Sequence, residues 1–221
     1  MEIGVDIGGT FTDLICRIKG QPDVILKLPS TPHRPSVAVI NGLKKILKLV
    51  AADPSRVRRF VHGTTVPTNI VLERTGARTG VITTRGFADV LEIGRQMRSH
   101  IYELQLDPET PVFLAPGARR VEVDERISSE GNIIQPLREN SVMSAVEALI
   151  EEGVTSIAVC LLFSFLNPLH ERSVRKIIEQ RWPDISVSLS CEVDPAFREY
   201  ERTVVTAFDA YIKPVVQHYL D

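Results

Sequence analysis

Alternating apolar residues open the chain and predict β-strands. Residues 3–7 and 10–18 flank the pair Gly8-Gly9, and a third run of this kind covers residues 24–28. Paired glycines between two such runs favour a hairpin, because glycine accepts the positive φ angles that such turns need. We therefore expect an antiparallel β-meander over the first thirty residues.

A helical spacing of apolar residues replaces this alternation further along the chain. It covers residues 35–50, where Pro35 suits a first helical turn and Asp53-Pro54 follows the end. A short strand at residues 59–62 then leads into a helix at residues 66–74, which has a proline near its first turn. Residues 81–83 are expected to form the next strand.

Residues 86–116 show no regular pattern and carry the turn-forming sequences DPETP and APG, so we expect a loop-rich region there. Regular patterns then return in this order: strand 120–127, a turn at SSEGN, helix 141–152, strand 157–163, helix 168–181, strand 185–189, and a last helix from Ala196 to about Leu220 that Pro214 interrupts. Asn167-Pro168 and Asp194-Pro195 each place a capping side chain before a proline, which marks two helix starts. The succession predicts an α/β fold in which an antiparallel start joins a parallel part.

The composition indicates a globular protein and narrows the classes of partner. With 221 residues, 43% of them hydrophobic, the chain can form one large domain or two small ones. Its formal net charge of -2 provides no basic field, so nucleic acid is not an expected partner. The longest apolar stretch, residues 157–165, is too short to cross a bilayer, and the first residues lack a signal-peptide pattern. We expect a cytoplasmic protein that does not bind membranes.

The three cysteines give no sign of a disulfide framework or a zinc site. Cys16, Cys160 and Cys191 lie far apart, form no Cys-x-x-Cys pair and are odd in number. We expect all three to be reduced, with Cys16 and Cys160 buried on strands.

The strongest candidate for chemistry is the sequence VDIGGTFTD at residues 5–13. The first strand brings Asp6 to its end, and two glycines and two threonines follow. Backbone N–H groups of such a turn can point at phosphate oxygens without interference from side chains, and Asp6 could hold a phosphate-bound Mg²⁺ through water. An ordinary two-residue hairpin in which Asp6 caps the turn is the alternative.

This motif and its followers carry a family resemblance. DIGGTFTD resembles the first phosphate loop of the actin, sugar-kinase and chaperone ATPase superfamily, and its Thr-Phe-Thr-Asp ending is similar to the hydantoinase A/5-oxoprolinase family. Later segments agree in order: HGTTV with Thr68-Asn69, LER at 72–74, ITTRGF at 82–87, DVLEIGRQ at 89–96, Glu125-Arg126, Pro168 with His170-Glu171, and REYER at 198–202. The match spans nearly the full chain.

The resemblance implies an actin-like (ribonuclease H-like) α/β ATPase lobe with a mixed sheet. In that fold, nucleotide lies between two lobes that each supply a phosphate loop, so residues 1–221 would be the N-terminal region and one lobe of a longer two-lobed ATPase. The implied cofactors are ATP and Mg²⁺, and the implied partners are a C-terminal hydantoinase A lobe and a hydantoinase B-type subunit. The isolated chain would be at most half of an ATP site.

The implied activity is ATP-dependent hydrolysis of a cyclic amide such as 5-oxoproline or a hydantoin. An ATP-dependent carboxylase subunit acting on a ketone such as acetone is an alternative, and a non-catalytic fragment that binds a partner is another. The implied phosphate-binding residues are Gly8, Gly9, Thr10 and Thr12. Asp6 would lie near Mg²⁺, and Asp13 would orient the loop or the attacked group.

A second candidate site is HGTTVPTN at residues 62–69. A strand that ends in His62 and passes through two threonines into a helix offers free amides and hydroxyls, which suits an anion. His62 could exchange protons with substrate near neutral pH, and Thr64, Thr65 and Asn69 are candidate substrate contacts. The alternative is structural: Thr64 or Thr65 caps the helix and His62 is satisfied in the core.

Charged residues later in the chain give further candidates. Arg95, with Arg98 nearby, is suited to grip a carboxylate or phosphate of the substrate, or else is a solvated surface group. Residues 198–202, REYER, are expected to form salt pairs along a helix or to contact a second lobe. We interpret His170, Glu171 and Asp194 as capping residues at helix starts, and Trp182 as a packing group.

Overall fold

The structure is a computed structural model and describes residues 1–31, 34–97, 102, 110–111 and 113–220. The chain divides into two compact units. The first comprises Met1–Thr75 with Val215–Asp221, and the second comprises Gly76–Pro214. Each unit has its own sheet and core.

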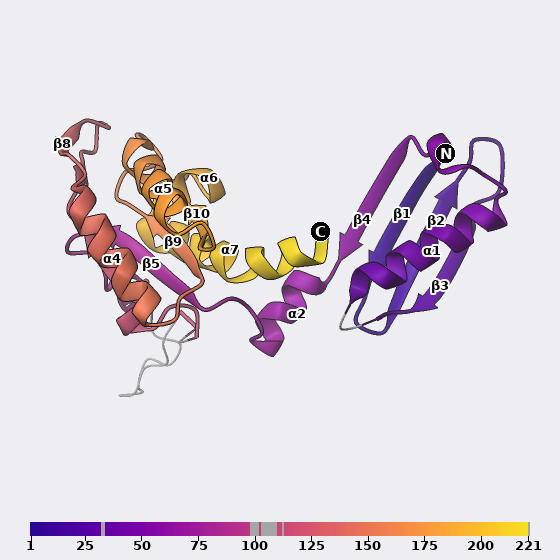
Figure 1. Cartoon of the computed structure of the whole chain (residues 1–221), viewed down its shortest axis with the longest axis horizontal. Coiled ribbons are helices and arrows are strands. Elements are labelled where there is room, and N and C mark those ends of the chain that lie inside the picture. Colours follow the sequence, from indigo (N-terminus) through magenta and orange to yellow (C-terminus); the bar gives the residue numbers. More distant parts are fainter. Residues whose placement is uncertain (32–33, 98–101, 103–109, 112, 221) are drawn as a thin grey trace. The chain divides into compact units, whose positions relative to one another are not determined.

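The first unit contains a four-stranded mixed sheet (Figure 1). The strands are β1 (Glu2–Ile7), β2 (Phe11–Arg17), β3 (Val24–Pro29) and β4 (Arg59–Thr64), in the order β3-β2-β1-β4. β1, β2 and β3 are antiparallel neighbours, so the expected meander is confirmed, whereas β4 runs parallel to β1.

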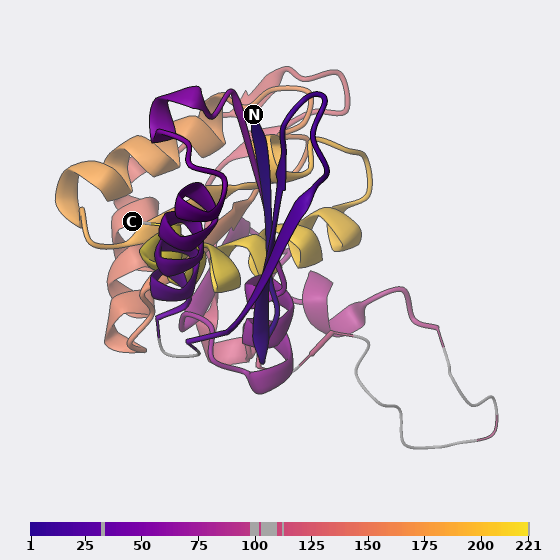
Figure 2. The ribbon, with the colours of Figure 1, turned by 90° about the vertical axis from the view of Figure 1, so that its right-hand side faces the viewer.

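One helix covers one face of this sheet. α1 (Pro35–Leu49) lies along the strands, as Figure 2 shows with the sheet seen almost edge-on. Its residues Val39 and Ile46 pack on the inward side chains of β1 and β2, among them Ile3, Val5 and Leu14. The short helix η1 (Pro54–Arg56) precedes β4, and α2 (Val66–Glu73) follows it.

The opposite face of the same sheet is apolar at its centre and exposed. Ile15, Ile25 and Val61 are 38%, 72% and 50% exposed around Gly4, where they line a shallow hollow. Charged residues occupy the ends of this face, with Asp6, Asp13 and Lys27 at the end where β1 stops. The described elements of the first unit therefore bury only one side of their sheet.

The second unit is built on a parallel sheet with the strand order β10-β9-β5-β6. Its strands are β5 (Thr79–Thr84), β6 (Arg120–Val123), β9 (Ser156–Cys160) and β10 (Ser186–Leu189). The expected strand 120–127 is divided in two. Its second part, β7 (Arg126–Ile127), pairs with β8 (Ile133–Gln135) in a separate hairpin around the SSEGN turn.

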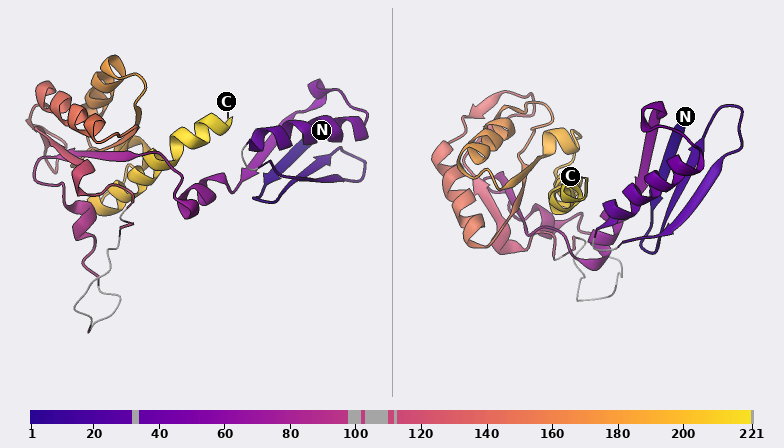
Figure 3. Two further views of the ribbon diagram at one scale, coloured as in Figure 1. Left: turned by 60° about the horizontal axis from the view of Figure 1, so that its bottom comes forward. Right: turned by 45° about the vertical axis from the view of Figure 1, so that its right-hand side comes forward.

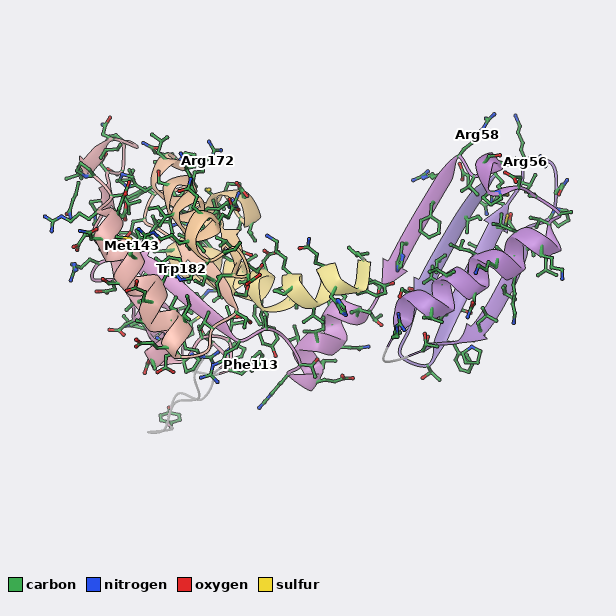
Figure 4. All side chains as sticks on the ribbon, viewed as in Figure 1. Arg56, Arg58, Phe113, Met143, Arg172 and Trp182 are labelled. Carbon is green, nitrogen blue, oxygen red and sulfur yellow. The ribbon has the colours of Figure 1, made fainter. Side chains whose placement is uncertain are left out.

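Helices lie on both faces of the parallel sheet (Figure 3). α4 (Glu139–Glu151) and α5 (Leu169–Arg181) pack on the face that presents Ile157 and Val159, while α7 (Glu199–Leu220) borders Cys160 on the other. Trp182, labelled in Figure 4, packs against the core formed with α4 and α5, as predicted. The short helices are α3 (Val90–Ile93), η2 (Gly117–Arg119) and α6 (Ser190–Val193).

Two expectations about the last helix are wrong. Pro214 lies inside α7 and does not interrupt it. The helix also begins at Glu199, and Asp194-Pro195 does not start it. The backbone N–H of Ala196 donates to the carbonyl of Asp194 at 2.7 Å, and Arg198 adopts a φ of 88°, so the chain turns before the helix can begin.

Further expectations from the sequence concern the cysteines, membrane-spanning helices and the region 86–116. Cys16 and Cys160 are buried on strands, and all three cysteines are free, as expected. Among the described residues, no helix is long and apolar enough to span a bilayer. The described part of residues 86–116 is mostly irregular, as expected, and contains α3.

Candidate functional site

The glycine turn joins β1 to β2 at one end of the first sheet. The N–H of Gly8 donates to the carbonyl of Phe11 at 2.9 Å, which closes a hairpin with Gly9 and Thr10 at its tip. Neither glycine has a positive φ. The expectation that these two glycines are needed for positive φ angles is therefore wrong. A β-carbon on Gly8 would lie 3.3 Å from the Phe11 carbonyl oxygen, which indicates that the close approach of backbone favours glycine there.

The amides at the tip of this turn are available. Among the described residues, the N–H groups of Gly9 and Thr10 have no hydrogen-bond partner. Both residues are exposed, and a β-carbon on Gly9 would meet only the amide nitrogen of Asn69, at 3.9 Å. Unpaired, uncovered amides of this kind suit an anion such as phosphate.

Thr12 and Ser30 support the turn from the side that α1 covers. Thr12 is fully buried, and its hydroxyl lies 3.0 Å from that of Ser30. The Ser30 hydroxyl donates to the carbonyl of Gly8 at 2.8 Å, and the Ser30 N–H donates to the carbonyl of Thr10 at 2.9 Å. Thr12 therefore holds the turn in shape, and its predicted contact with phosphate stays a prediction. No sequence motif points to Ser30.

Asp6 and Asp13 form a carboxylate pair on the open face of the sheet. They are partners in the β1–β2 ladder, so their side chains project from the same face. Lys27, the partner of Asp13 on β3, places its ammonium nitrogen 3.1 Å from the Asp13 carboxylate. A β-carbon on Gly63 would lie 3.2 Å from an Asp6 carboxylate oxygen, so the missing side chain leaves that oxygen uncovered.

His62 lies on the opposite face from Asp6. In the parallel ladder, His62 pairs with the buried Val5, while its neighbour Gly63 pairs with Asp6. The imidazole Nε2 lies 2.6 Å from the hydroxyl oxygen of Tyr219, and the two rings make an edge contact. Burial lowers the pKa of His62 below its ordinary value, although Asp6 opposes this effect. The two predicted catalytic residues, Asp13 and His62, are thus on different sides of the sheet.

The residues after His62 connect β4 to the glycine turn. The Thr64 hydroxyl accepts a hydrogen bond from the N–H of Val66, the first residue of α2, at 3.1 Å, whereas the N-cap residue Thr65 makes no side-chain cap bond. The N–H and the hydroxyl of Thr65 both donate to the carbonyl of Ile7, at 3.1 and 3.2 Å. Asn69 faces Gly9. Predicted residues from both motifs therefore meet at the carboxyl ends of β1 and β4.

Arg95 belongs to the second unit, unlike the other predicted site residues. Its guanidinium Nε lies 2.9 Å from a carboxylate oxygen of Glu201, and the group stands over the ring of Tyr200. Its side chain is 53% exposed. Arg98 lies outside the described residues.

A buried polar cluster in the second unit corrects the interpretation of His170 and Glu171 as helix caps. The carboxylate of Glu171, fully buried, accepts hydrogen bonds from the N–H groups of Leu161 and Cys191 and from the Ser190 hydroxyl, at 2.6–2.9 Å. Nδ1 of His170 lies 2.6 Å from the buried carboxylate of Glu125. Both side chains therefore connect separate elements, and neither bonds the first amides of its own helix.

The charged segment 198–202 follows the expectation only in part. Arg198 and Glu201 form the predicted i, i+3 pair at 3.8 Å. Arg202, however, is only 2% exposed and donates to the carbonyls of Leu161 and Ala196. Its guanidinium also lies over the ring of Phe165, so Arg202 joins α7 to the loop after β9.

The first unit fits the phosphates of ATP and a divalent cation. The amides of Gly9 and Thr10 are unpaired and both residues are exposed, and the uncovered carboxylate of Asp6 stands one residue before the turn. Mg²⁺ prefers such carboxylate oxygens and keeps most of its water. The described residues contain no cluster of three or more potential metal-ligating side chains.

The fold is that of an actin-like ATPase lobe, in agreement with solved relatives. The chain belongs to the hydantoinase/oxoprolinase family: the family profile described as "Hydantoinase/oxoprolinase N-terminal region" matches residues 2–182. The resemblance read from the motifs is thereby confirmed.

Individual relatives agree with this assignment. The chain is 34% identical over 226 residues to caprolactamase subunit alpha of Pseudomonas jessenii, covering 100% of this chain and 32% of the relative. The crystal structure of ATP-dependent caprolactamase from that organism matches it with a TM-score of 0.82, 33% identity and coverage of 100% and 32% of the two chains.

Two further relatives have names that describe other activities. The 5-oxoprolinase of Saccharomyces cerevisiae is 33% identical over 261 residues, which cover 100% of this chain and 20% of the relative. The nucleotide-free structure of acetone carboxylase, described with a mechanism of ATP-dependent acetone carboxylation, matches with a TM-score of 0.84 and 28% identity over 99% and 33% of the two chains. The chain thus spans a third or less of the length of each of these relatives.

Proposed function

We propose that this chain is the N-terminal lobe of an ATP-dependent hydrolase that opens a cyclic amide of the hydantoin or 5-oxoproline type. The observation that carries the proposal is the pair of unpaired amides at Gly9 and Thr10 beside the uncovered carboxylate of Asp6. Relatives named caprolactamase and 5-oxoprolinase support the reaction class, because their names describe hydrolysis of cyclic amides.

Each residue of the turn has a distinct role in this proposal. Gly8 and Gly9 keep side chains away from the phosphates, while the amides of Gly9 and Thr10 donate to their oxygens. Thr12 supports the turn, and Asp6 holds Mg²⁺ through water. Asp13, held by Lys27, orients the loop or the attacked group. ATP, when bound, supplies a phosphoryl group that converts the poorly reactive amide oxygen into part of a good leaving group.

The residues after β4 are assigned to the substrate. His62 takes part in proton exchange, and Thr64, Thr65 and Asn69 stand around the turn where they can contact the substrate. Arg95 is proposed to bind a substrate carboxylate. For this contact to form, its ion pair with Glu201 would have to break.

A second candidate function is an ATP-dependent carboxylase subunit that acts on an acetone-type ketone. The structural match with acetone carboxylase favours it, because that match is as good as the match with caprolactamase. The same turn would serve either reaction. The two functions differ in their need for bicarbonate and in their partner subunits.

The proposed assembly contains more than this chain. We expect a C-terminal hydantoinase A lobe with the second phosphate loop, and a hydantoinase B-type subunit, all in the cytoplasm. Relatives that are named as subunits support this expectation.

The test is ATP hydrolysis by the protein assembled with the downstream polypeptide that its relatives contain. Stimulation by 5-oxoproline or a hydantoin supports the hydrolase. Stimulation by acetone with bicarbonate would replace it with the carboxylase. No hydrolysis and no nucleotide binding under any of these conditions would leave only the non-catalytic, partner-binding role.

A further inference from the structure

Tyr219, near the end of α7, is 157 residues from His62 in the chain and in direct contact with it in the first unit. Its hydroxyl oxygen lies 2.6 Å from Nε2 of His62, and the two ring centroids are 5.7 Å apart at an angle of 80°. Tyr219 also packs against the core beneath α1. No motif in the sequence connects the two residues.

We propose that Tyr219 is the positioning residue of His62: its hydroxyl donates a hydrogen bond to Nε2, so that the imidazole carries its proton on Nδ1. In this arrangement Nδ1–H is the group that His62 offers to a ligand, and it acts as a hydrogen-bond donor to a substrate or phosphate oxygen. The role in substrate binding rests on the function proposed above, whereas the state of the ring does not.

The direction of the hydrogen bonds follows from the neighbouring groups. The Thr64 hydroxyl accepts from the N–H of Val66 at 3.1 Å, so its own proton is free to be donated. It is also hydrogen-bonded to the Tyr219 hydroxyl and lowers the pKa of that group. A Thr64 hydroxyl that donates to Tyr219 leaves the Tyr219 proton to point at Nε2. The chain of donors thus runs from α2 through Thr64 and Tyr219 to His62.

The protonation of both rings agrees with this direction. Burial is the largest effect on each of them: it lowers the pKa of His62 and raises that of Tyr219. The imidazole is therefore favoured in its neutral form, and the phenol keeps its proton near neutral pH. A neutral imidazole has one donor and one acceptor nitrogen, so an acceptor at Nε2 makes Nδ1 the donor.

The environment of Nδ1 leaves it available. Among the described residues, this atom has no hydrogen-bond partner, and the edge contact of Phe60 with the His62 ring holds the ring from a second direction. The ring is thus fixed by Tyr219 and Phe60 while one polar atom stays unpaired.

The direct test is the tautomeric state of His62 in the 221-residue chain. Long-range ¹H–¹⁵N correlation spectra of the labelled protein at neutral pH report which imidazole nitrogen carries the proton. The chain has five histidines, and His62 is assigned by the signals that disappear in His62→Gln. We expect a protonated Nδ1 and an unprotonated Nε2, the reverse of the tautomer that a free histidine side chain prefers.

Three variants complete the experiment. Tyr219→Phe keeps the ring and removes the hydroxyl, and we expect it to lower the ratio of Nδ1–H to Nε2–H tautomer by about threefold to tenfold, as the loss of one hydrogen bond implies. Thr64→Val removes the donor to Tyr219 and is expected to act in the same direction. Tyr102→Phe, at a side chain that is 97% exposed in the second unit, should change nothing.

Either of two results overturns the proposal. One is an Nε2-protonated or doubly protonated His62 in the wild-type chain. The other is an unchanged tautomer ratio in Tyr219→Phe while the amide spectrum shows an intact fold. Because the measurement needs no nucleotide, a failure of ATP binding would refute the proposed function and leave this result in place.

Discussion

Asp6 and Asp13 face each other across β1 and β2 on the sheet face that α1 leaves open. Like charges directly opposite in an antiparallel pair are unfavourable, so the arrangement needs a cation nearby. Lys27 supplies one beside Asp13, at 3.1 Å, but no basic group pairs with Asp6 among the described residues. We infer that the position beside Asp6 is where Mg²⁺ belongs.

Asp6→Asn is expected to weaken Mg²⁺-dependent ATP binding by at least about tenfold, because it removes a charge-assisted contact while preserving shape. The fold should be retained, since Asp6 is exposed. Isothermal titration with ATP in the presence and absence of Mg²⁺, on the protein assembled with the downstream polypeptide, measures the effect. Asp23→Asn is the matched control, because Asp23 is an exposed carboxylate of the same unit that pairs with Arg17. Equal Mg²⁺ dependence in both variants would argue against a metal at Asp6.

Gly9→Val tests the need for an uncovered turn. The backbone of Gly9 has no positive φ, and a β-carbon there meets only Asn69 at 3.9 Å, so we expect thermal stability within about 0.5 kcal/mol of the wild type. ATP affinity should nevertheless fall, because the methyl groups would cover the amides of Gly9 and Thr10. Gly117→Ala, where a β-carbon meets nothing within 4 Å, serves as the control. Unchanged affinity in Gly9→Val would place the phosphates elsewhere.

Gly76→Ala should destabilise the second unit by about 1–3 kcal/mol through overpacking. A β-carbon at this position would lie 2.3 Å from the ring of Tyr211. The ring cannot easily move, because Tyr211 is buried, its carbonyl accepts from Ala77 at 2.8 Å, and Phe113 contacts it. Urea unfolding followed by tyrosine fluorescence gives the change in free energy of unfolding. A variant as stable as Gly117→Ala would show that the contact is not tight.

Glu171→Ala is expected to lower the free energy of unfolding by about 2–4 kcal/mol. The substitution leaves the N–H groups of Leu161 and Cys191 and the Ser190 hydroxyl without their acceptor inside the protein. Glu179→Ala, an exposed glutamate on the same helix, is the control and should change stability little. Comparable losses in the two variants, measured by urea unfolding, would contradict a central role of the buried carboxylate.

Stability should also depend on pH through His62. Burial lowers its pKa in the folded state below the ordinary value of 6.5. As pH falls below about 6.5, the unfolded chain therefore takes up a proton before the folded chain does, and the stability contributed by neutral His62 is lost. His62→Gln should remove this part of the loss between about pH 7.5 and 5.0 in urea unfolding. Identical pH dependence in both proteins would contradict the direction of the shift.

Local patterns were sufficient to predict most of the fold. The alternation in residues 3–28 and the spacing in residues 35–50 identify the meander and α1, because each element buries one regular face. Pro214 was misleading, since a proline ends most helices but is tolerated when the surrounding contacts support the helix. The sequence also suggested salt pairs for Arg202, which tertiary contacts bury instead.

In the candidate site, too, local sequence predicted some residues, and tertiary contacts determine the others. The glycine turn and Asp6 stand out because they are contiguous in sequence, although the expected positive φ angles are absent. Ser30 and Tyr219 reach the site only through tertiary contacts, so no local pattern could identify them. The separation of Asp13 and His62 onto two faces likewise depends on the register of β4 against β1, which sequence spacing does not specify.

The most direct measurement is a crystal structure with Mg²⁺ and a non-hydrolysable ATP analogue, obtained with the complementary lobe present. The account predicts phosphate oxygens within hydrogen-bonding distance of the Gly9 and Thr10 amides, and a magnesium ion whose water is held by Asp6. A nucleotide bound elsewhere with the turn empty, or with these two amides pointing away from it, would contradict the account.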